Sequence, residues 1–148
     1  MKHSVLFLLS VVGGCSGYAA LQFVTSQSPS SFIADVVGRL GMLYGVLLLT
    51  TGLYALMVSI KAVRSNGIDA GDSRSLWIAG LPVLVGMMGV LHGYVGLAKY
   101  AGSLPAGMEM PHTTVWTTAI VGVFLGLPVF AILLIGRRMR HAPDPLAR

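Results

Sequence analysis

The chain has 148 residues, of which 55% are hydrophobic and only 10% are charged, and its formal net charge is +5. A soluble domain carries about 25% charged residues, so a chain this poor in charge has too little polar surface to stay dissolved. The positive charge flanks apolar segments, as topology signals do, which favours a membrane protein without a nucleic-acid partner.

Four long apolar stretches follow one another along the chain, at residues 4–24, 32–62, 76–99 and 113–137. Each is near or above the ~20 residues that a helix needs to cross ~30 Å of hydrocarbon. Their apolar residues do not alternate with polar ones, which favours helices over a barrel. We therefore predict an all-α integral membrane protein. It forms a single four-helix domain in contact with membrane lipid, followed by a flexible cytoplasmic tail at 138–148.

The first stretch also resembles a signal peptide. Lys2 precedes an apolar run, and the residues before Cys15 resemble a lipoprotein processing site. Cleavage there would leave three spans. We expect the segment to be retained, which gives four.

The second stretch begins near Ser31 and carries charge at its start. Asp35 stands four residues before Arg39, so the two side chains are expected to pair on one helix face. Glycines at steps of seven follow at Gly38, Gly45 and Gly52.

The distribution of Lys and Arg predicts the orientation. With the N-terminus in the cytoplasm, eight basic residues lie on the cytoplasmic side, and only Arg39 and Lys99 lie on the other side. This bias predicts that both termini are cytoplasmic. We expect a multi-pass protein of a bacterial inner membrane.

The third stretch carries a glycine stripe and a histidine. The stripe consists of Gly86, Gly89, Gly93 and Gly96, at steps of three, four and three, which places them on one helix face. Such stripes let membrane helices approach closely, either within one chain or between subunits. His92 is the only ionisable residue deep in a predicted span. It could take part in a proton path, ligate a haem, or hydrogen-bond to a neighbouring helix.

The fourth stretch combines hydroxyl groups, small residues and a proline. Thr117 and Thr118 could line a wet path, bridge helices, or bond back to the carbonyl of the preceding turn. Thr114, Thr118, Gly122 and Gly126 are each four apart, so they share one face. Pro128, like Pro82 in the third stretch, removes a backbone hydrogen bond and can kink its helix.

Catalytic chemistry has no support in the sequence. No acidic residue lies in the middle of a span, and no nucleotide-binding loop, zinc helix or catalytic triad is recognisable. The single cysteine, Cys15, excludes an intrachain disulfide and a cysteine metal cluster. We therefore expect no enzyme, no metal site and no cofactor.

The third and fourth stretches resemble the MotA/TolQ/ExbB family over residues 77–138. Gly86-Met-Met-Gly89-Val-Leu-His-Gly93 resembles the family's Gly-Leu-x-Gly-Thr-Val-x-Gly signature. Thr118-Ala-Ile-Val-Gly122, followed by Pro128, resembles its Thr-Ala-x-Gly helix. The chain departs from the family at Val90, where a pore threonine is usual, and in its short loop at 61–75.

The resemblance implies a ring-shaped homo-oligomer, typically a pentamer, in a proton-driven motor or energy-transducing complex. The ring would surround the helix of a smaller single-span partner, similar to ExbD or MotB, whose aspartate carries the ion. Residues facing the pore or partner would come from the third and fourth spans: His92, Thr117, Thr118, Gly122, Gly126 and Pro128. The stripe Gly86, Gly89, Gly93 and Gly96 would serve helix packing or oligomer contacts.

A second hypothesis is a structural or haem-associated anchor of a redox or photosynthetic complex, using His92. The other histidines, His3, His112 and His141, lie at or beyond helix ends. Within this hypothesis a partner would have to supply a second haem ligand. A third hypothesis is a scaffold that only packs helices.

Overall fold

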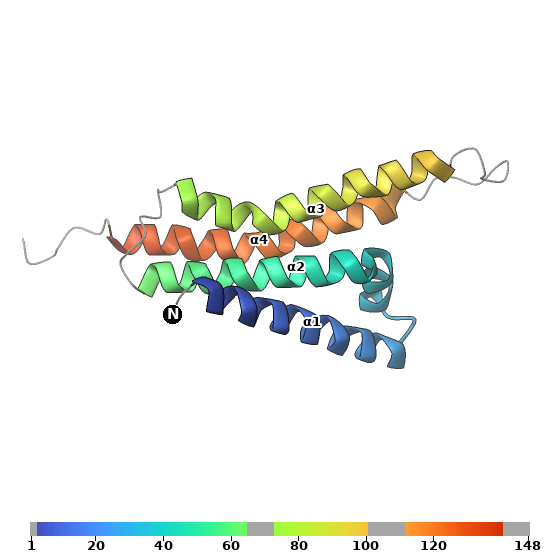
Figure 1. The fold of residues 1–148 in the computed structure, drawn as a ribbon, viewed down its shortest axis with the longest axis horizontal. Coiled ribbons are helices and arrows are strands. Elements are labelled where there is room, and N and C mark those ends of the chain that lie inside the picture. Colours follow the sequence, from blue (N-terminus) through green and yellow to red (C-terminus); the bar gives the residue numbers. More distant parts are fainter. Residues whose placement is uncertain (1–2, 65–72, 101–111, 141–148) are drawn as a thin grey trace, which may run out of the picture.

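The computed structural model describes residues 3–64, 73–100 and 112–140, and these form helices throughout most of their length (Figure 1). The helices are α1 (His3–Gln27), α2 (Phe32–Arg64), α3 (Ser73–Tyr100) and α4 (His112–Arg140). The described residues contain no strand, so the predicted all-α class is confirmed for them. The predicted tail at 138–148 begins within α4, and its residues 141–148 lie outside the described part.

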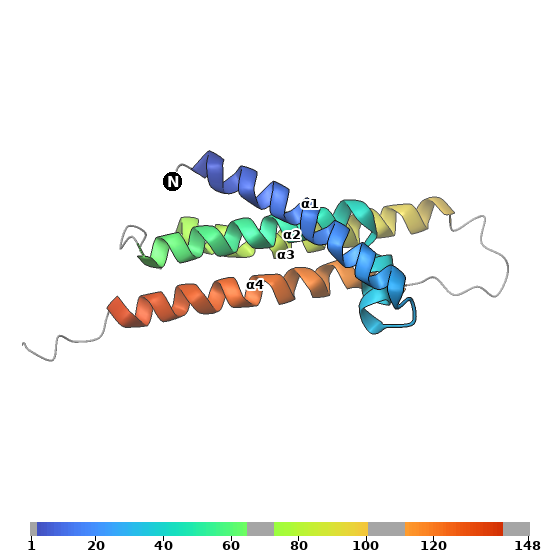
Figure 2. The ribbon, with the colours of Figure 1, turned by 90° about the horizontal axis from the view of Figure 1, so that it is seen from below.

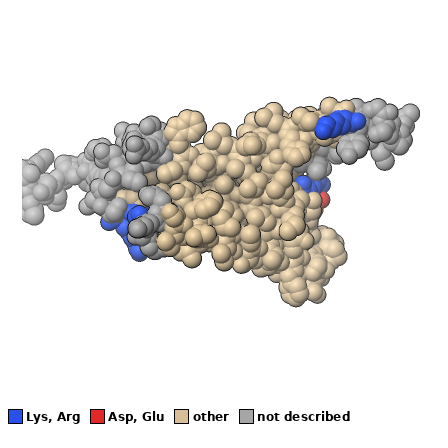
Figure 3. Space-filling view, viewed as in Figure 1, with Lys and Arg blue, Asp and Glu red and all other residues tan. Residues whose placement is uncertain are grey.

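Each of the four helices is long and apolar enough to cross a membrane. Large apolar side chains such as Leu8, Leu91 and Phe124 point outward and are more than half exposed. Figure 3 shows Lys and Arg at the two ends of the molecule, with an uncharged surface between them. An apolar belt between charged ends is typical of a multi-pass membrane protein.

The helices are arranged around α2, which contacts α1, α3 and α4. α3 and α4 form a second antiparallel pair, and α1 packs on α2 alone among the described helices (Figures 1 and 2). The start of α1 and the ends of α2 and α4 lie together, at what we call the Arg64 end. The connection between α1 and α2 lies at the opposite end, which we call the Arg39 end.

The interior consists of small apolar clusters between these helices. Near the Arg64 end, Ala55 of α2 packs with Val129 and Leu133 of α4. Further toward the Arg39 end, Val90 of α3 packs with α4. Burial of Val90 in this contact places it inside the chain, at the position where the family carries a pore threonine.

The start of α2 follows from its capping residues. The hydroxyl of Ser31 accepts a hydrogen bond from the backbone N–H of Ala34 at 3.2 Å, which satisfies one donor of the first helical turn. Asp35 lies in that turn, where a negative charge is favourable. The predicted pair is confirmed: Arg39 donates from Nε to Oδ1 of Asp35 at 2.9 Å and approaches Oδ2 at 2.8 Å.

α2 differs from the continuous helix that the sequence predicts. Gly41 has φ 66° and ψ 166°, a backbone conformation that is available almost only to glycine. Residues 32–40, which we call the short segment, therefore turn away from the axis of residues 42–64 (Figure 1). Residues 42–64 still extend roughly 35 Å at 1.5 Å per residue, enough to cross the hydrocarbon region.

Candidate functional site

The glycine stripe of α3 faces α4 within the same chain. A Cβ added at Gly86 would lie 2.6 Å from the carbonyl oxygen of Thr118. At Gly89 the nearest atom would be the Thr118 hydroxyl oxygen at 2.7 Å, and at Gly93 a methyl group of Val115 at 2.9 Å. These three glycines therefore allow the close approach of α3 and α4 that larger residues would prevent.

The other small or kinking residues of the two helices lie in different surroundings. Gly122 of α4 also allows the close approach to α3, since a Cβ there would lie 2.5 Å from the carbonyl oxygen of Pro82. Gly126 is buried and Pro128 is exposed. Gly96, the last member of the stripe, has no neighbour within 4 Å of an added Cβ, so it lies beyond the close contact.

Thr118 lies between the two helices. Its side chain is 5% exposed. Its Oγ1 lies 3.1 Å from the carbonyl oxygen of Gly86 on α3 and 3.1 Å from that of Val115 in its own helix. One hydroxyl proton is shared between these acceptors, so Thr118 bridges α3 and α4 in the isolated chain and does not face outward.

His92 lies on the outside of the bundle and is bound to α2. Its side chain is exposed, and its Nδ1 lies 3.0 Å from the hydroxyl oxygen of Tyr44. The two rings meet edge to face, with centroids 5.8 Å apart. The Tyr44 hydroxyl also lies 3.5 Å from the carbonyl oxygen of Met88. We call Tyr44 and His92 the polar pair.

The polar pair lies within the apolar belt and not at its edge. His92 precedes Lys99 by seven residues, which corresponds to about 10 Å along a helix. Tyr44 was not identified from the sequence as a site residue, because a tyrosine in an apolar span is by itself no signal of a partner on another helix. A second polar contact joins α3 and α4, where Trp116 Nε1 donates to the Tyr94 hydroxyl at 3.2 Å.

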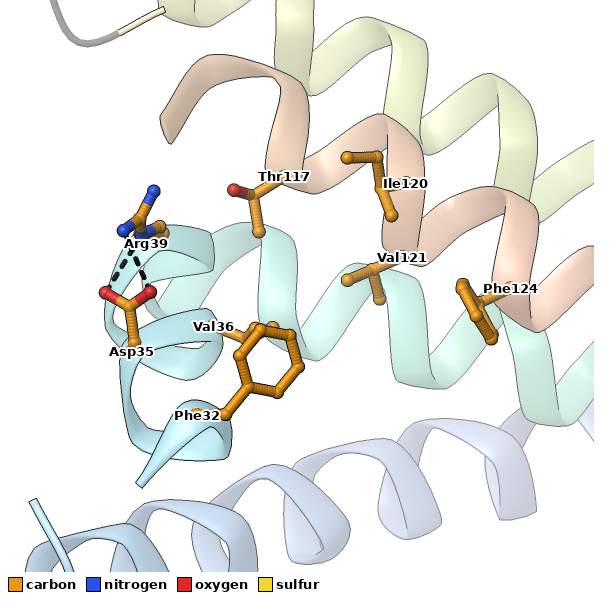
Figure 4. A pocket seen from close by; sticks show the side chains of 8 residues that line it. All are labelled: Phe32, Asp35, Val36, Arg39, Thr117, Ile120, Val121 and Phe124. Atoms are coloured by element: carbon orange, nitrogen blue, oxygen red, sulfur yellow. Dashed lines mark hydrogen bonds and ion pairs between the residues drawn. The ribbon is translucent and has the colours of Figure 1, made fainter. Parts of the chain in front are cut away.

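Thr117 lines a groove to which neither Thr118 nor His92 contributes. The groove lies between α4 and the short segment, and Arg39 and Asp35 line the same end of it (Figure 4). Thr117 and His92 are therefore not parts of one site. The described residues also include no cluster of three or more His, Cys, Asp or Glu side chains that could hold a metal ion.

No known protein family, no curated protein and no solved structure matches this chain.

Proposed function

We propose that this chain is the ring-forming subunit of a proton-driven motor or energy-transducing complex of a bacterial inner membrane. In this proposal several copies surround the transmembrane helix of a smaller partner, which carries the ion-binding aspartate. The resemblance of residues 77–138 to the MotA/TolQ/ExbB family suggests the activity. The close α3–α4 hairpin supports it, because the glycines and Thr118 that carry the resemblance are also the residues that join the two helices.

The polar pair, in which His92 is exposed and Tyr44 is half-buried, is the observation that carries the assembly part of the proposal. An ionisable side chain within a membrane span usually faces protein or a wet cavity, because exposure of its polar atoms to hydrocarbon is unfavourable. His92 lies within the apolar belt and is exposed in the isolated chain. A neighbouring protein surface that covers the pair would remove this cost.

The acidic residues support the division of labour between the chain and its partner. Five acidic residues occur in the sequence, and Asp35, the one within the described helices, lies in the first turn of α2 beside Arg39. The carboxylate that binds the ion would then belong to the partner. In the assembled ring the polar pair would face that partner, while Thr118 would hold the hairpin together.

Native mass spectrometry of the complex, extracted from its own membrane, tests this proposal. We expect several copies of this chain together with a smaller chain that has one membrane span. A protein that is monomeric and without a second chain in mild detergent would contradict it.

Two substitutions at His92 show whether its side chain contributes to assembly with the smaller chain or to proton flux. His92→Leu removes both ring nitrogens and should lower recovery of the smaller chain severalfold. His92→Gln keeps hydrogen bonding without titration, so assembly and proton flux should persist. Leu91→Val, at an exposed neighbouring position, is the control. Loss of flux in His92→Gln with assembly intact would show that this chain supplies the titrating group, contrary to the proposal.

A haem-associated anchor is the second candidate function, and the geometry of His92 favours it over a scaffold that only packs helices. A histidine that ligates a metal usually has its other ring nitrogen hydrogen-bonded, and Nδ1 of His92 is held by Tyr44. The described residues would supply one axial ligand through Nε2, and a partner would supply the other. A haem absorption band that disappears in His92→Gln would favour this function over the ring subunit.

A further inference from the structure

The hydroxyl proton of Tyr44 determines which ring nitrogen of His92 carries hydrogen. A tyrosine has one hydroxyl proton to donate. The Tyr44 oxygen lies 3.0 Å from Nδ1 of His92 and 3.5 Å from the carbonyl oxygen of Met88. The second distance is much longer than the usual O–H···O hydrogen bond of about 2.8 Å. The Met88 carbonyl also accepts the backbone N–H of His92, four residues later in α3. Tyr44 therefore donates to Nδ1.

A neutral imidazole whose Nδ1 accepts a hydrogen bond has its proton on Nε2. His92 then presents an N–H donor at Nε2, which has no hydrogen-bond partner in the described part of the chain. In the opposite tautomer Nδ1 would donate to Tyr44, and the half-buried Tyr44 hydroxyl would keep only the 3.5 Å contact with Met88. A poorly paired hydroxyl away from water is unfavourable. The geometry of the polar pair thus favours the Nε2–H tautomer.

The Nε2–H donor lies within the apolar belt, where there is no water to accept from it, so it requires an acceptor from protein. Along the described spans the backbone carbonyls pair within their helices. Asp35, the one carboxylate side chain among the described residues, pairs with Arg39. A symmetric contact of two copies through the polar pair would place two N–H donors against each other. The donor therefore fits an acceptor on a different chain.

We propose that Nε2 of His92 donates a hydrogen bond to a carboxylate in the span of the smaller partner chain. Tyr44 is the positioning residue that holds His92 in this tautomer. The carboxylate rests on the proposed function, in which the partner carries an acid, whereas the tautomer rests on the contacts of Tyr44 alone. A neutral N–H stabilises a carboxylate without a full positive charge, whereas Lys or Arg would favour the ionised acid much more strongly. An acid bound to His92 can therefore still take up and release a proton.

The Nε2–H tautomer also separates carboxylate binding by His92 from metal ligation. A haem iron binds the lone pair of Nε2, and Nδ1–H would then have to donate to the Tyr44 oxygen. The same 3.0 Å distance between that oxygen and Nδ1 fits both states, which differ in the position of the proton. A measurement of the tautomer therefore distinguishes a carboxylate from a metal ion as the ligand of the polar pair.

Nitrogen-15 NMR of the full-length chain in lipid nanodiscs, labelled at histidine, tests the tautomer. Protonated and unprotonated ring nitrogens resonate in separate regions. The chain has four histidines, and the signals that disappear in His92→Gln are those of His92. We expect a protonated Nε2 and an Nδ1 that accepts a hydrogen bond. A proton on Nδ1 in the unsubstituted chain would overturn the proposal.

A pair of tyrosine substitutions tests whether Tyr44 positions His92. Tyr44→Phe removes the hydroxyl and should shift the Nδ1 signal to that of a nitrogen without a hydrogen bond. Tyr54→Phe is the matched control, because Tyr54 also lies on α2 but packs edge to face against Phe7 of α1. It should leave the His92 signals unchanged. An unshifted Nδ1 signal in Tyr44→Phe would overturn the positioning role.

The complex extracted from its own membrane tests the carboxylate. The Nε2–H proton signal of His92 should move downfield when the smaller chain is bound, and alanine in place of the acidic residue in that chain's span should reverse the shift. An unchanged signal would overturn the carboxylate contact. If no smaller chain is found, the proposed function and the carboxylate contact both fail. If it is found but Nδ1 carries the proton, the present inference fails and the proposed function stands.

Discussion

Single atoms decide how close α3 comes to α4. At Gly86 and Gly122 the neighbouring atoms are backbone carbonyl oxygens, of Thr118 and Pro82 respectively. A backbone atom cannot rotate away as the end of a side chain can, so a Cβ at either glycine must displace a whole helix. The Thr118 hydroxyl adds a hydrogen bond across the same contact, and the close approach is what makes that bond possible.

Gly86→Ala should therefore destabilise the hairpin, although alanine is the better helix former. We expect a loss of about 1–3 kcal/mol in the free energy of unfolding, the usual cost of overpacking. The measurement is reversible unfolding in mixed micelles.

Gly96→Ala is the matched control for this substitution. It makes the same change on the same stripe, at a position where an added Cβ has no neighbour within 4 Å. It should leave stability unchanged or slightly raise it. If both substitutions cost the same, the close contact at Gly86 does not contribute to stability.

At the scale of the elements, α2 is unusual because it is two pieces. The turn at Gly41 lets the short segment lie at the Arg39 end, while residues 42–64 remain between the other helices. Gly45 and Gly52 lie on this second piece and meet different helices. A Cβ at Gly45 would collide with the ring of Tyr18 on α1, and one at Gly52 would lie 3.4 Å from Leu125 on α4.

Gly41→Ala should strain the turn without any steric clash. No atom lies within 4 Å of an added Cβ there, so the cost comes from the backbone conformation alone. We expect the free energy of unfolding to fall by about 1–3 kcal/mol, the usual cost of holding a residue in a sparsely populated region of φ/ψ space. Spin labels at Ile33 and Val123, in a Cys15→Ser background, should also report a changed distance between the short segment and α4.

Gly38→Ala serves as the control at the element scale. Gly38 also has no neighbour within 4 Å, but its backbone is not in the positive-φ region. Gly38→Ala should therefore raise the free energy of unfolding by about 0.5–1 kcal/mol, because glycine within an ordinary helix is less favourable than alanine by this amount. Equal effects at Gly38 and Gly41 would show that the turn is not maintained in solution.

At the scale of the whole molecule, the charges at the two ends agree with the predicted orientation. Lys61 and Arg64 lie at the Arg64 end, whereas Arg39 and Lys99 lie at the other. Arg39 is balanced by Asp35, which further reduces the positive charge of the Arg39 end. The fold is thus compatible with insertion of the Arg64 end toward the cytoplasm.

Single-cysteine labelling in whole cells tests this orientation. In a Cys15→Ser background, a cysteine at Ser28, in the connection between α1 and α2, should react with an impermeant thiol reagent from outside. One at Asn66 should react only after the membrane is opened. Labelling of Asn66 in intact cells would contradict this orientation.

The sequence by itself determined the number of helices, their approximate bounds and the Asp35–Arg39 pair. These properties depend on local signals: the length of an apolar run, a capping serine, and charges four residues apart on one helix. The sequence also identified Gly86, Gly89 and Gly93 as residues of a helix contact, whereas Thr118 was predicted to face the pore or partner. Their spacing shows which face they share, but it does not show which helix lies against that face.

Only the tertiary structure decided the partners of these faces. The α3 stripe meets α4 of the same chain, so Thr118 bridges two helices and does not line an outer surface. His92 meets Tyr44, which is 48 residues away in the sequence. The turn at Gly41 and the groove that depends on it were also not predicted. A glycine in an apolar run looks the same in the sequence whether its φ is negative or positive, and the packing of the other helices selects between the two.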